Sequence, residues 1–389
     1  MTTTTTIPNA SAAQGANPLK GLLSYGQSPW LDFIRRNILL NGNLKKMIQE
    51  DGLRGMTSNP AIFEKAISAG DDYDDIIKAP DAKSSTAMDL YERIAIRDVQ
   101  DAADIFKSVH TETKGRDGYV SLEVSPYLAY DTQGTINEAL RLWKTVGRQN
   151  VMIKIPATPQ GVPAIRQTLE EGININITLL FAQSAYEQVA EAFLSALEAR
   201  VRKGQDISHI ASVASFFVSR IDSLVDSKID LIEKTETDAK RKALLESVRG
   251  KVAIANARRT YAKYQELYGG ARWKALAAKG GQTQRLLWAS TSTKNPKYRD
   301  VLYVEELIGA DTVDTIPPAT LDAFRDHGKL RPSLTENVAG ANKTMSDLEA
   351  AGISMKEVTD KLIADAVKLF QEPFQQLLDT ITQHAGVRA

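Results

Sequence analysis

A lysine inside an apolar run is the strongest chemical signal in this sequence. Lys154 lies within residues 151–156, a stretch typical of a buried strand, and its neighbours on both sides are apolar. Burial removes water from an ammonium group and favours the neutral amine, which can attack a carbonyl carbon and form a Schiff base. A lysine near the end of a strand can instead extend its head group to water. The spacing alone leaves both interpretations open.

Glu123 is a second charged residue inside a strand-like run, residues 119–124. Its carboxylate could transfer protons while a carbinolamine forms and collapses. It could also act only as an ion-pair partner of Lys154, or lie exposed at the edge of a sheet.

Two amides and a threonine interrupt other strand-like runs. Asn176 and Thr178 share one face of a strand, because side chains alternate along it. They could orient substrate hydroxyls or a water molecule, or form a hydrogen-bonded polar layer inside the core. Asn59 precedes Pro60 at the end of another strand, and this pattern taken alone indicates a turn.

The polar residues have one position in common, the carboxyl end of a predicted strand. The set is Asn59, Glu123, Lys154, Thr178, Ser215 and Ser290. Barrel active sites are assembled at that end from several strands, so one shared pocket explains the set more economically than six separate structural roles. Arg220 and Lys294 follow two of these strands, and with backbone N–H groups of the adjoining turns they could hold a phosphate. Either cation alone would be an ordinary solvated charge.

Composition and missing motifs exclude several other kinds of site. The sequence has no cysteine, which excludes disulfides, thiolate nucleophiles and cysteine-ligated metals. Its 48 basic and 48 acidic residues give a net charge of zero, so no general basic field attracts nucleic acid or an anionic membrane. Glycine-rich nucleotide motifs, a G-x-S-x-G elbow and compact histidine patterns are also missing. We expect neither a metal nor a nucleic acid partner.

The elements that position these residues alternate between short β-rich runs and amphipathic helical stretches, which predicts an α/β fold with a parallel sheet. The candidate strands are residues 53–58, 119–124, 151–155, 173–178, 209–215, 285–290, 301–304 and 312–316. Eight is the strand number of a (β/α)8 TIM barrel, and a doubly wound open sheet is the alternative. Additional helices are expected within residues 60–115, 222–278 and 340–382, the last with a kink at Pro373.

The chain is predicted to form one domain, residues 19–389, after a disordered leader. Residues 1–18 are rich in Thr, Ala, Asn and Gly, and they lack the basic and apolar regions of a secretory signal. No stretch has the eighteen or so apolar residues of a membrane span. The expected location is the cytoplasm.

Taken together, these motifs resemble transaldolase, in its longer bacterial type. The similar segments are residues 26–32, 55–63, 120–124 with 130–131, 152–158, 174–181, 215–222 and 288–296. They occur in the order expected for that family over roughly residues 20–320, so the match is specific and does not depend on one short motif. The resemblance implies a single barrel of the class I aldolase type that needs no cofactor.

For catalysis, the resemblance implies a Schiff base on Lys154 that carries a dihydroxyacetone unit. Asp32 would accept the donor's hydroxyl proton as the carbon–carbon bond breaks and would return it to the acceptor. Glu123 and Thr178 would hold the water that shuttles protons while the imine forms and is hydrolysed.

For binding, the resemblance implies that Asn59 and Asn176 hydrogen-bond the carried unit and that Ser215 positions the substrate. Arg220, Ser290 and Lys294 would bind its phosphate. Shorter family members have an arginine in the loop of Ser290, where this sequence has Lys294. A lysine binds phosphate as a point charge without bidentate geometry.

The implied reaction converts sedoheptulose 7-phosphate and glyceraldehyde 3-phosphate into erythrose 4-phosphate and fructose 6-phosphate, within the pentose phosphate pathway. One alternative is a Schiff-base aldolase that releases free dihydroxyacetone. Another is a silent barrel that only binds sugar phosphates, although that interpretation predicts substitution at Lys154, Glu123 or Asp32, and all three are present. The expected partners are small sugar phosphates, and the protein is expected to be a monomer or a homodimer.

Overall fold

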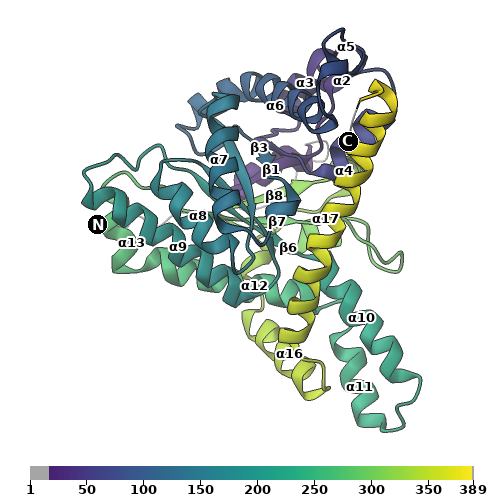
Figure 1. The fold of residues 1–389 in the computed structure, drawn as a ribbon. Coiled ribbons are helices and arrows are strands. Elements are labelled where there is room, and N and C mark those ends of the chain that lie inside the picture. Colours follow the sequence, from purple (N-terminus) through teal and green to yellow (C-terminus); the bar gives the residue numbers. More distant parts are fainter. Residues whose placement is uncertain (1–16, 388–389) are drawn as a thin grey trace.

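Eight parallel strands pair in chain order and close into a barrel, because β8 pairs with β1 (Figure 1). The computed structural model describes residues 17–387. The strands are β1 (Gln27–Asp32), β2 (Gly55–Thr57), β3 (Tyr119–Glu123), β4 (Val151–Pro156), β5 (Ile175–Leu180), β6 (Ser212–Phe217), β7 (Arg285–Ala289) and β8 (Thr312–Ile316). The predicted (β/α)8 barrel is confirmed, and the open-sheet alternative is wrong.

Two errors cancelled in the predicted strand count. The strand expected at residues 301–304 is wrong, because Leu302–Glu306 forms helix α14. Four apolar residues fit a buried helical turn as well as a strand. The strand β1 was missed, since Pro29 and the polar residues at its start weaken its strand pattern. The Pro29 carbonyl nevertheless accepts a hydrogen bond from the Arg54 N–H.

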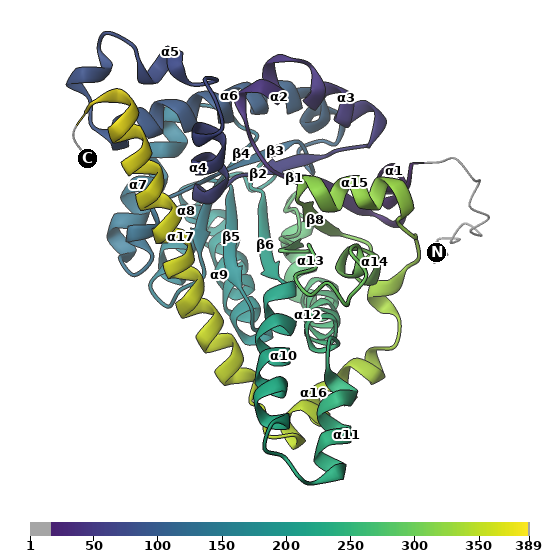
Figure 2. The same cartoon turned by 90° about the vertical axis from the view of Figure 1, so that its right-hand side faces the viewer.

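Helices surround the barrel, as Figure 2 shows from a second side. In the first half of the chain they are α1 (Pro18–Gly21), α2 (Arg36–Leu40), α3 (Asn43–Glu50), α4 (Pro60–Ser68), α5 (Asp74–Ile77), α6 (Ala87–Glu112), α7 (Thr132–Val146), α8 (Gly161–Glu170) and α9 (Gln183–Arg202). In the second half they are α10 (Ser219–Glu233), α11 (Ala239–Val248), α12 (Val252–Gly269), α13 (Ala271–Ala277), α14, α15 (Pro318–His327), α16 (Val338–Ala350) and α17 (Met355–Ala385). Short 3-10 helices are η1 (Leu22–Tyr25), η2 (Ala82–Ser84), η3 (Pro126–Leu128) and η4 (Ser333–Thr335).

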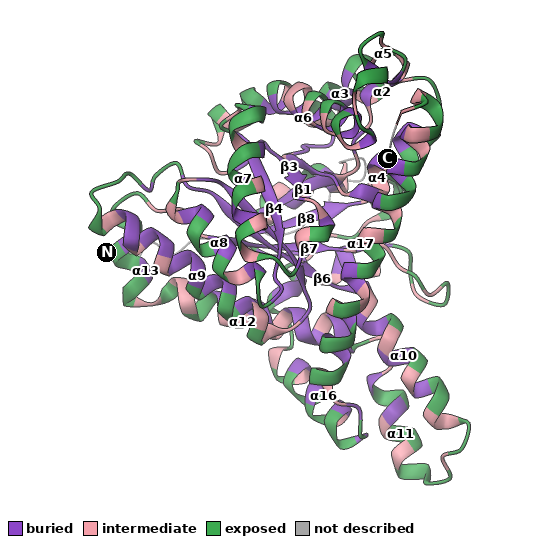
Figure 3. Ribbon diagram, viewed as in Figure 1, coloured by how far each residue is buried: buried purple, intermediate pink, exposed green. Residues whose placement is uncertain are grey.

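The strands are covered on both faces, as expected for a parallel sheet enclosed by helices (Figure 3). Every strand residue is buried except Asp32, which is half-buried at the carboxyl end of β1. Polar side chains within these strands are therefore costly unless they are paired. This cost makes the buried polar residues of the barrel informative about function.

The long helix α17 crosses the molecule from α16 to α4 in both ribbon views (Figures 1 and 2). It contacts α4, α6, α10 and β5. Pro373 lies inside α17, and the helix continues past it. Within residues 17–387, no helix has the length and apolar character needed to cross a membrane.

The described structure begins inside the predicted leader. Pro18 starts α1, and the Asn17 side chain accepts a hydrogen bond from the Leu19 N–H. Residues 1–16 lie outside the described part of the chain, so the disorder predicted for them remains a prediction.

Candidate active site

A cavity of about 400 Å³ opens at the carboxyl end of the barrel. Eight of the ten predicted site residues line it: Asp32, Asn59, Lys154, Thr178, Ser215, Arg220, Ser290 and Lys294. Glu123 and Asn176 lie behind the wall, where each contacts a residue that lines the cavity. One pocket therefore gathers side chains from strands and loops that are far apart in the sequence.

Lys154 projects into the barrel rather than out to water. Its side chain is 6% exposed, and its Nζ lies 3.3 Å from Glu123 Oε2 and 3.3 Å from the Ser58 carbonyl oxygen. The pair follows from the register of the sheet, because Glu123 and Lys154 face each other on the adjacent strands β3 and β4. Burial raises the pKa of Glu123, and the Lys154 ammonium offsets this only in part. The carboxyl is therefore biased toward holding a proton next to the amine.

Asp32 lies at the carboxyl end of β1. Its Oδ1 accepts a 2.7 Å hydrogen bond from Thr57 Oγ1, and the Thr57 and Thr315 hydroxyls are 2.6 Å apart. Burial raises the pKa of Asp32, while Lys154 and the Thr57 hydroxyl oppose that rise. A carboxyl in these surroundings can both accept and return a proton.

An irregularity in β5 orients Thr178. The pairing of β5 with β6 slips between Ile177 and Leu180, and Leu179 takes a left-handed backbone with φ of 62°. Such a backbone is strained for leucine and often marks a functional site. Thr178 Oγ1 is buried without a hydrogen-bond partner among the described residues, as is Glu123 Oε2. Glu123 Oε2 nevertheless forms the 3.3 Å ion pair with Lys154 Nζ, whereas Thr178 Oγ1 lies in the cavity wall and can bind a water or a substrate hydroxyl.

Asn176 belongs to a polar layer inside the barrel and does not line the cavity. Its Oδ1 accepts a 2.6 Å hydrogen bond from Ser215 Oγ, and its Nδ2 donates a 2.9 Å hydrogen bond to Ser121 Oγ. The amide is fully buried. Asn176 thus fixes the position of Ser215, which does line the cavity.

The mouth of the cavity is basic. Arg220 lies in the first turn of α10, Lys294 lies in the loop after β7, and Lys65 lies on α4. Among the ion pairs of residues 17–387, none includes these three side chains. Burial lowers the pKa of Arg220, and burial together with the Arg220 charge lowers the pKa of Lys294. Cations kept close together without carboxylate partners form a ready site for a phosphate dianion.

Ser290 helps to set the shape of this mouth. Its backbone is left-handed with φ of 56°, and its carbonyl accepts a 3.1 Å hydrogen bond from the Ser219 N–H. The two serine hydroxyls are 3.0 Å apart. The loop after β7 is therefore tied to the start of α10, where Arg220 lies.

Asn59 has the structural role that its turn pattern indicates and also lines the cavity. Its Oδ1 accepts a 3.1 Å hydrogen bond from the Ile62 N–H and caps α4, with Pro60 as the first residue of the helix. The turn and the site are therefore the same feature.

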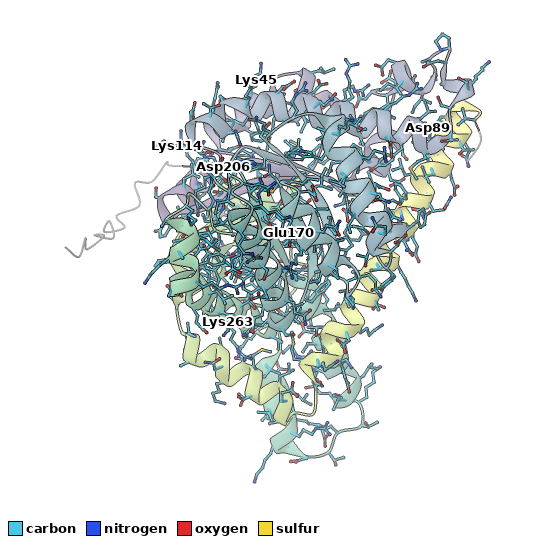
Figure 4. All side chains as sticks on the ribbon, turned by 60° about the vertical axis from the view of Figure 1, so that its left-hand side comes forward. Lys45, Asp89, Lys114, Glu170, Asp206 and Lys263 are labelled. Atoms are coloured by element: carbon cyan, nitrogen blue, oxygen red, sulfur yellow. The ribbon has the colours of Figure 1, made fainter. Side chains whose placement is uncertain are left out.

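Among the cavity-lining residues that sequence reasoning missed, Lys65, Leu369 and Phe370 lie on helices. Leu369 and Phe370 belong to α17, and the Phe370 ring centroid lies 5.6 Å from Lys154 Nζ. The helical pattern predicted that α17 exists, and it carried no signal for which residues reach the barrel mouth. Figure 4 draws all described side chains and labels two ordinary lysines, Lys45 and Lys114, which are exposed at the outer surface.

Comparison with known proteins agrees with this geometry. A family model described as transaldolase/fructose-6-phosphate aldolase matches residues 29–381. The chain is 48% identical over 369 residues to a transaldolase of Trichodesmium erythraeum, a match that covers 94% of this chain and 97% of the relative. It is 46% identical to "Transaldolase 2" of a Nostoc species (94% and 97% covered) and 43% identical to a transaldolase of Saccharopolyspora erythraea (94% and 97% covered). The resemblance seen in the motifs is thus confirmed, and the chain belongs to the transaldolase/fructose-6-phosphate aldolase family of enzymes.

Proposed function

We propose that this protein transfers a dihydroxyacetone unit between sugar phosphates through a Schiff base on Lys154. The direction named above, from sedoheptulose 7-phosphate and glyceraldehyde 3-phosphate, and its reverse are both included. The observation that supports this most strongly is the buried Lys154–Glu123 pair at the base of a cavity with a basic mouth. The cytoplasm is the proposed location and the pentose phosphate pathway the proposed context.

In the first step, the Lys154 amine attacks the ketone of the donor. The carbinolamine must then lose water, which requires a proton on the departing hydroxyl. Glu123, whose pKa burial raises, supplies and recovers that proton, and Thr178 helps to hold the water that carries it. The product is a protonated imine, which withdraws electrons from the neighbouring carbon.

In the second step, Asp32 removes the proton of the C4 hydroxyl and the C3–C4 bond breaks. The electron pair of that bond moves into the protonated imine and leaves a neutral enamine, so no free carbanion forms. The aldose phosphate departs, a second aldose phosphate enters, and Asp32 returns the proton as the new bond forms. Asn59 and Ser215 hold hydroxyls of the retained unit, and Asn176 acts by fixing Ser215.

The phosphate lies at the basic mouth, where we assign it to Arg220, Ser290 and Lys294, with Lys65 as a further cation. Arg220 lines the cavity, and its buried Nε has no hydrogen-bond partner among the described residues. These contacts place the donor ketone against Lys154 and are remade by each acceptor.

Borohydride trapping tests the proposal. The protein is incubated with fructose 6-phosphate and borohydride, and its intact mass and peptide map are then measured. One dihydroxyacetone adduct on Lys154 is expected, and the same adduct should form in Lys45→Ala, which removes an exposed lysine. Lys154→Ala should remain folded and form none.

The other outcomes separate the alternatives. Without an adduct, a folded protein that binds the sugar phosphate would be a silent barrel. With an adduct and rapid release of dihydroxyacetone in the presence of acceptor, the protein would be an aldolase.

A further inference from the structure

Phe370 covers the reactive lysine from the side of the C-terminal helix. Its ring lines the cavity, and its centroid lies 5.6 Å from Lys154 Nζ. Other side chains of the cavity wall, such as Thr178 and Ser215, are polar and come from the barrel strands. Phe370 reaches the site from α17, an element outside the barrel (Figure 2).

Side-chain contacts hold this turn of α17 in place. Four residues after Phe370, Phe374 is buried and packs edge-on against Tyr91 and Tyr127, with centroid distances of 5.2 and 5.6 Å. The Tyr127 hydroxyl donates a 2.7 Å hydrogen bond to Gln375. Both tyrosines lie outside α17, Tyr91 on α6 and Tyr127 in η3. The helix is thus anchored directly beside the residue that covers the lysine.

Pro373 interrupts the hydrogen bonding of α17 beside these anchors. Proline has no N–H, so the helical hydrogen bond from residue 373 to the carbonyl of Leu369 cannot form. The backbone is therefore weakened in the turn that carries Leu369 and Phe370. The contacts of Phe374 with Tyr91 and Tyr127 hold α17 in the turn that follows Phe370.

We infer that Phe370 keeps water away from the lysine-bound three-carbon unit and thereby sets the partition between transfer and release. This inference rests on the function proposed above. Release requires a proton on the enamine carbon, which gives a protonated imine, and then one water across its C=N bond. The products are free dihydroxyacetone and the lysine ammonium. A ring over the nitrogen obstructs the approach of that water, and its π face also favours the positive charge of the imine.

Leu369 provides a matched comparison. It lines the same cavity from the adjacent position of α17, yet it is 44% exposed, and Phe370 is the one that contacts the lysine. Truncation of Leu369 should widen the mouth of the cavity, whereas truncation of Phe370 should expose the Lys154 nitrogen to water. The two changes should therefore differ in their effect on release.

The experiment measures free dihydroxyacetone and transferred product from fructose 6-phosphate, with and without erythrose 4-phosphate. Wild type, Phe370→Ala, Phe370→Leu and Leu369→Ala are compared. In Phe370→Ala, the ratio of release to transfer should rise on the order of ten-fold, because water reaches the imine. In Phe370→Leu, which keeps an apolar side chain over the nitrogen, this ratio should rise less. In Leu369→Ala, the ratio should equal that of wild type.

Borohydride trapping and thermal unfolding are measured for each variant, to show that the variant is folded and still forms the Lys154 adduct. If Phe370→Ala and Phe370→Leu are folded, form the Lys154 adduct and keep the wild-type ratio, the inference is wrong. An equal rise in Leu369→Ala would also overturn it, since the effect would then come from the mouth. Failure of wild type to form the adduct would instead refute the proposed function. If Phe370→Ala does not fold, the ratio of release to transfer in Phe370→Leu tests the inference.

Discussion

A buried carboxyl behind the loop that follows β7 should make the stability of this protein fall as pH rises. Asp314 on β8 is fully buried, its Oδ1 accepts a 2.9 Å hydrogen bond from Thr291 Oγ1, and its Oδ2 has no partner among the described residues. Burial raises the pKa of Asp314 to about 8 from 3.8. Thr291 directly follows Ser290, so this carboxyl also supports the loop that reaches Lys294.

The sign follows from the direction of the shift. The folded protein holds the Asp314 proton up to about pH 8, whereas the unfolded chain loses it near pH 4, so stability is lost as pH rises through that interval. Proton linkage gives this group about 2.7 kcal/mol at pH 6 and about 0.2 kcal/mol at pH 8.5. The expected loss between the two conditions is about 2.5 kcal/mol.

Asp314→Asn isolates this contribution. Asparagine has nearly the same shape, can still accept the Thr291 hydrogen bond and carries no charge at either pH. The free energy of unfolding is measured in urea at both pH values for wild type, Asp314→Asn and the control Asp71→Asn, which changes an exposed aspartate. Asp222, whose pKa burial raises to about 7, titrates in all three proteins and cancels in the comparison. The reasoning is refuted if wild type and Asp314→Asn lose the same stability.

Three further changes test the assigned roles. Asp32→Ala should still form the trapped imine but cleave the carbon–carbon bond about 10²- to 10⁴-fold more slowly in single-turnover assays; loss of trapping would assign Asp32 elsewhere. Lys65→Met should raise the KM for fructose 6-phosphate by roughly ten-fold with kcat little changed, and an unaltered KM would remove Lys65 from the phosphate site. Asn176→Ala breaks two buried hydrogen bonds and should lower the unfolding free energy by about 2 to 4 kcal/mol; a loss near zero would show that the polar layer does not depend on this amide.

The barrel was predictable because short β-rich runs alternate with amphipathic helical stretches along the chain, but the boundaries and presence of single elements were not. Residues 301–304 and β1 show the limit, since both depend on contacts that a short window does not contain. β1 is a strand because it is hydrogen-bonded on both sides, to β2 and β8, despite Pro29. The same strand supplies Asp32, which only the family resemblance identified.

Several site residues inside strands could be predicted from the sequence, whereas Lys65 and Phe370, which lie on helices, could not. Lys154 and Glu123 could be predicted because burial of a charge inside a strand is costly unless the charge is paired or functional. Neighbouring parallel strands bring these two charges together. Asn176 was found by the same rule, and its place in the polar layer shows that the rule detects burial rather than contact with substrate.

Helical residues give no comparable signal. A lysine on a helix is ordinary, and an apolar residue on an amphipathic helix is expected to be in the core, so Lys65 and Phe370 resemble many others. Their roles depend on where α4 and α17 cross the end of the barrel, and α17 begins more than 150 residues after β4 ends. In this fold the strands supply the groups that react, and the added helices determine what else can reach those groups. Differences in water access between relatives should therefore map to α17, and differences in phosphate affinity to α4, α10 and the loop after β7, while Lys154 and Glu123 stay the same.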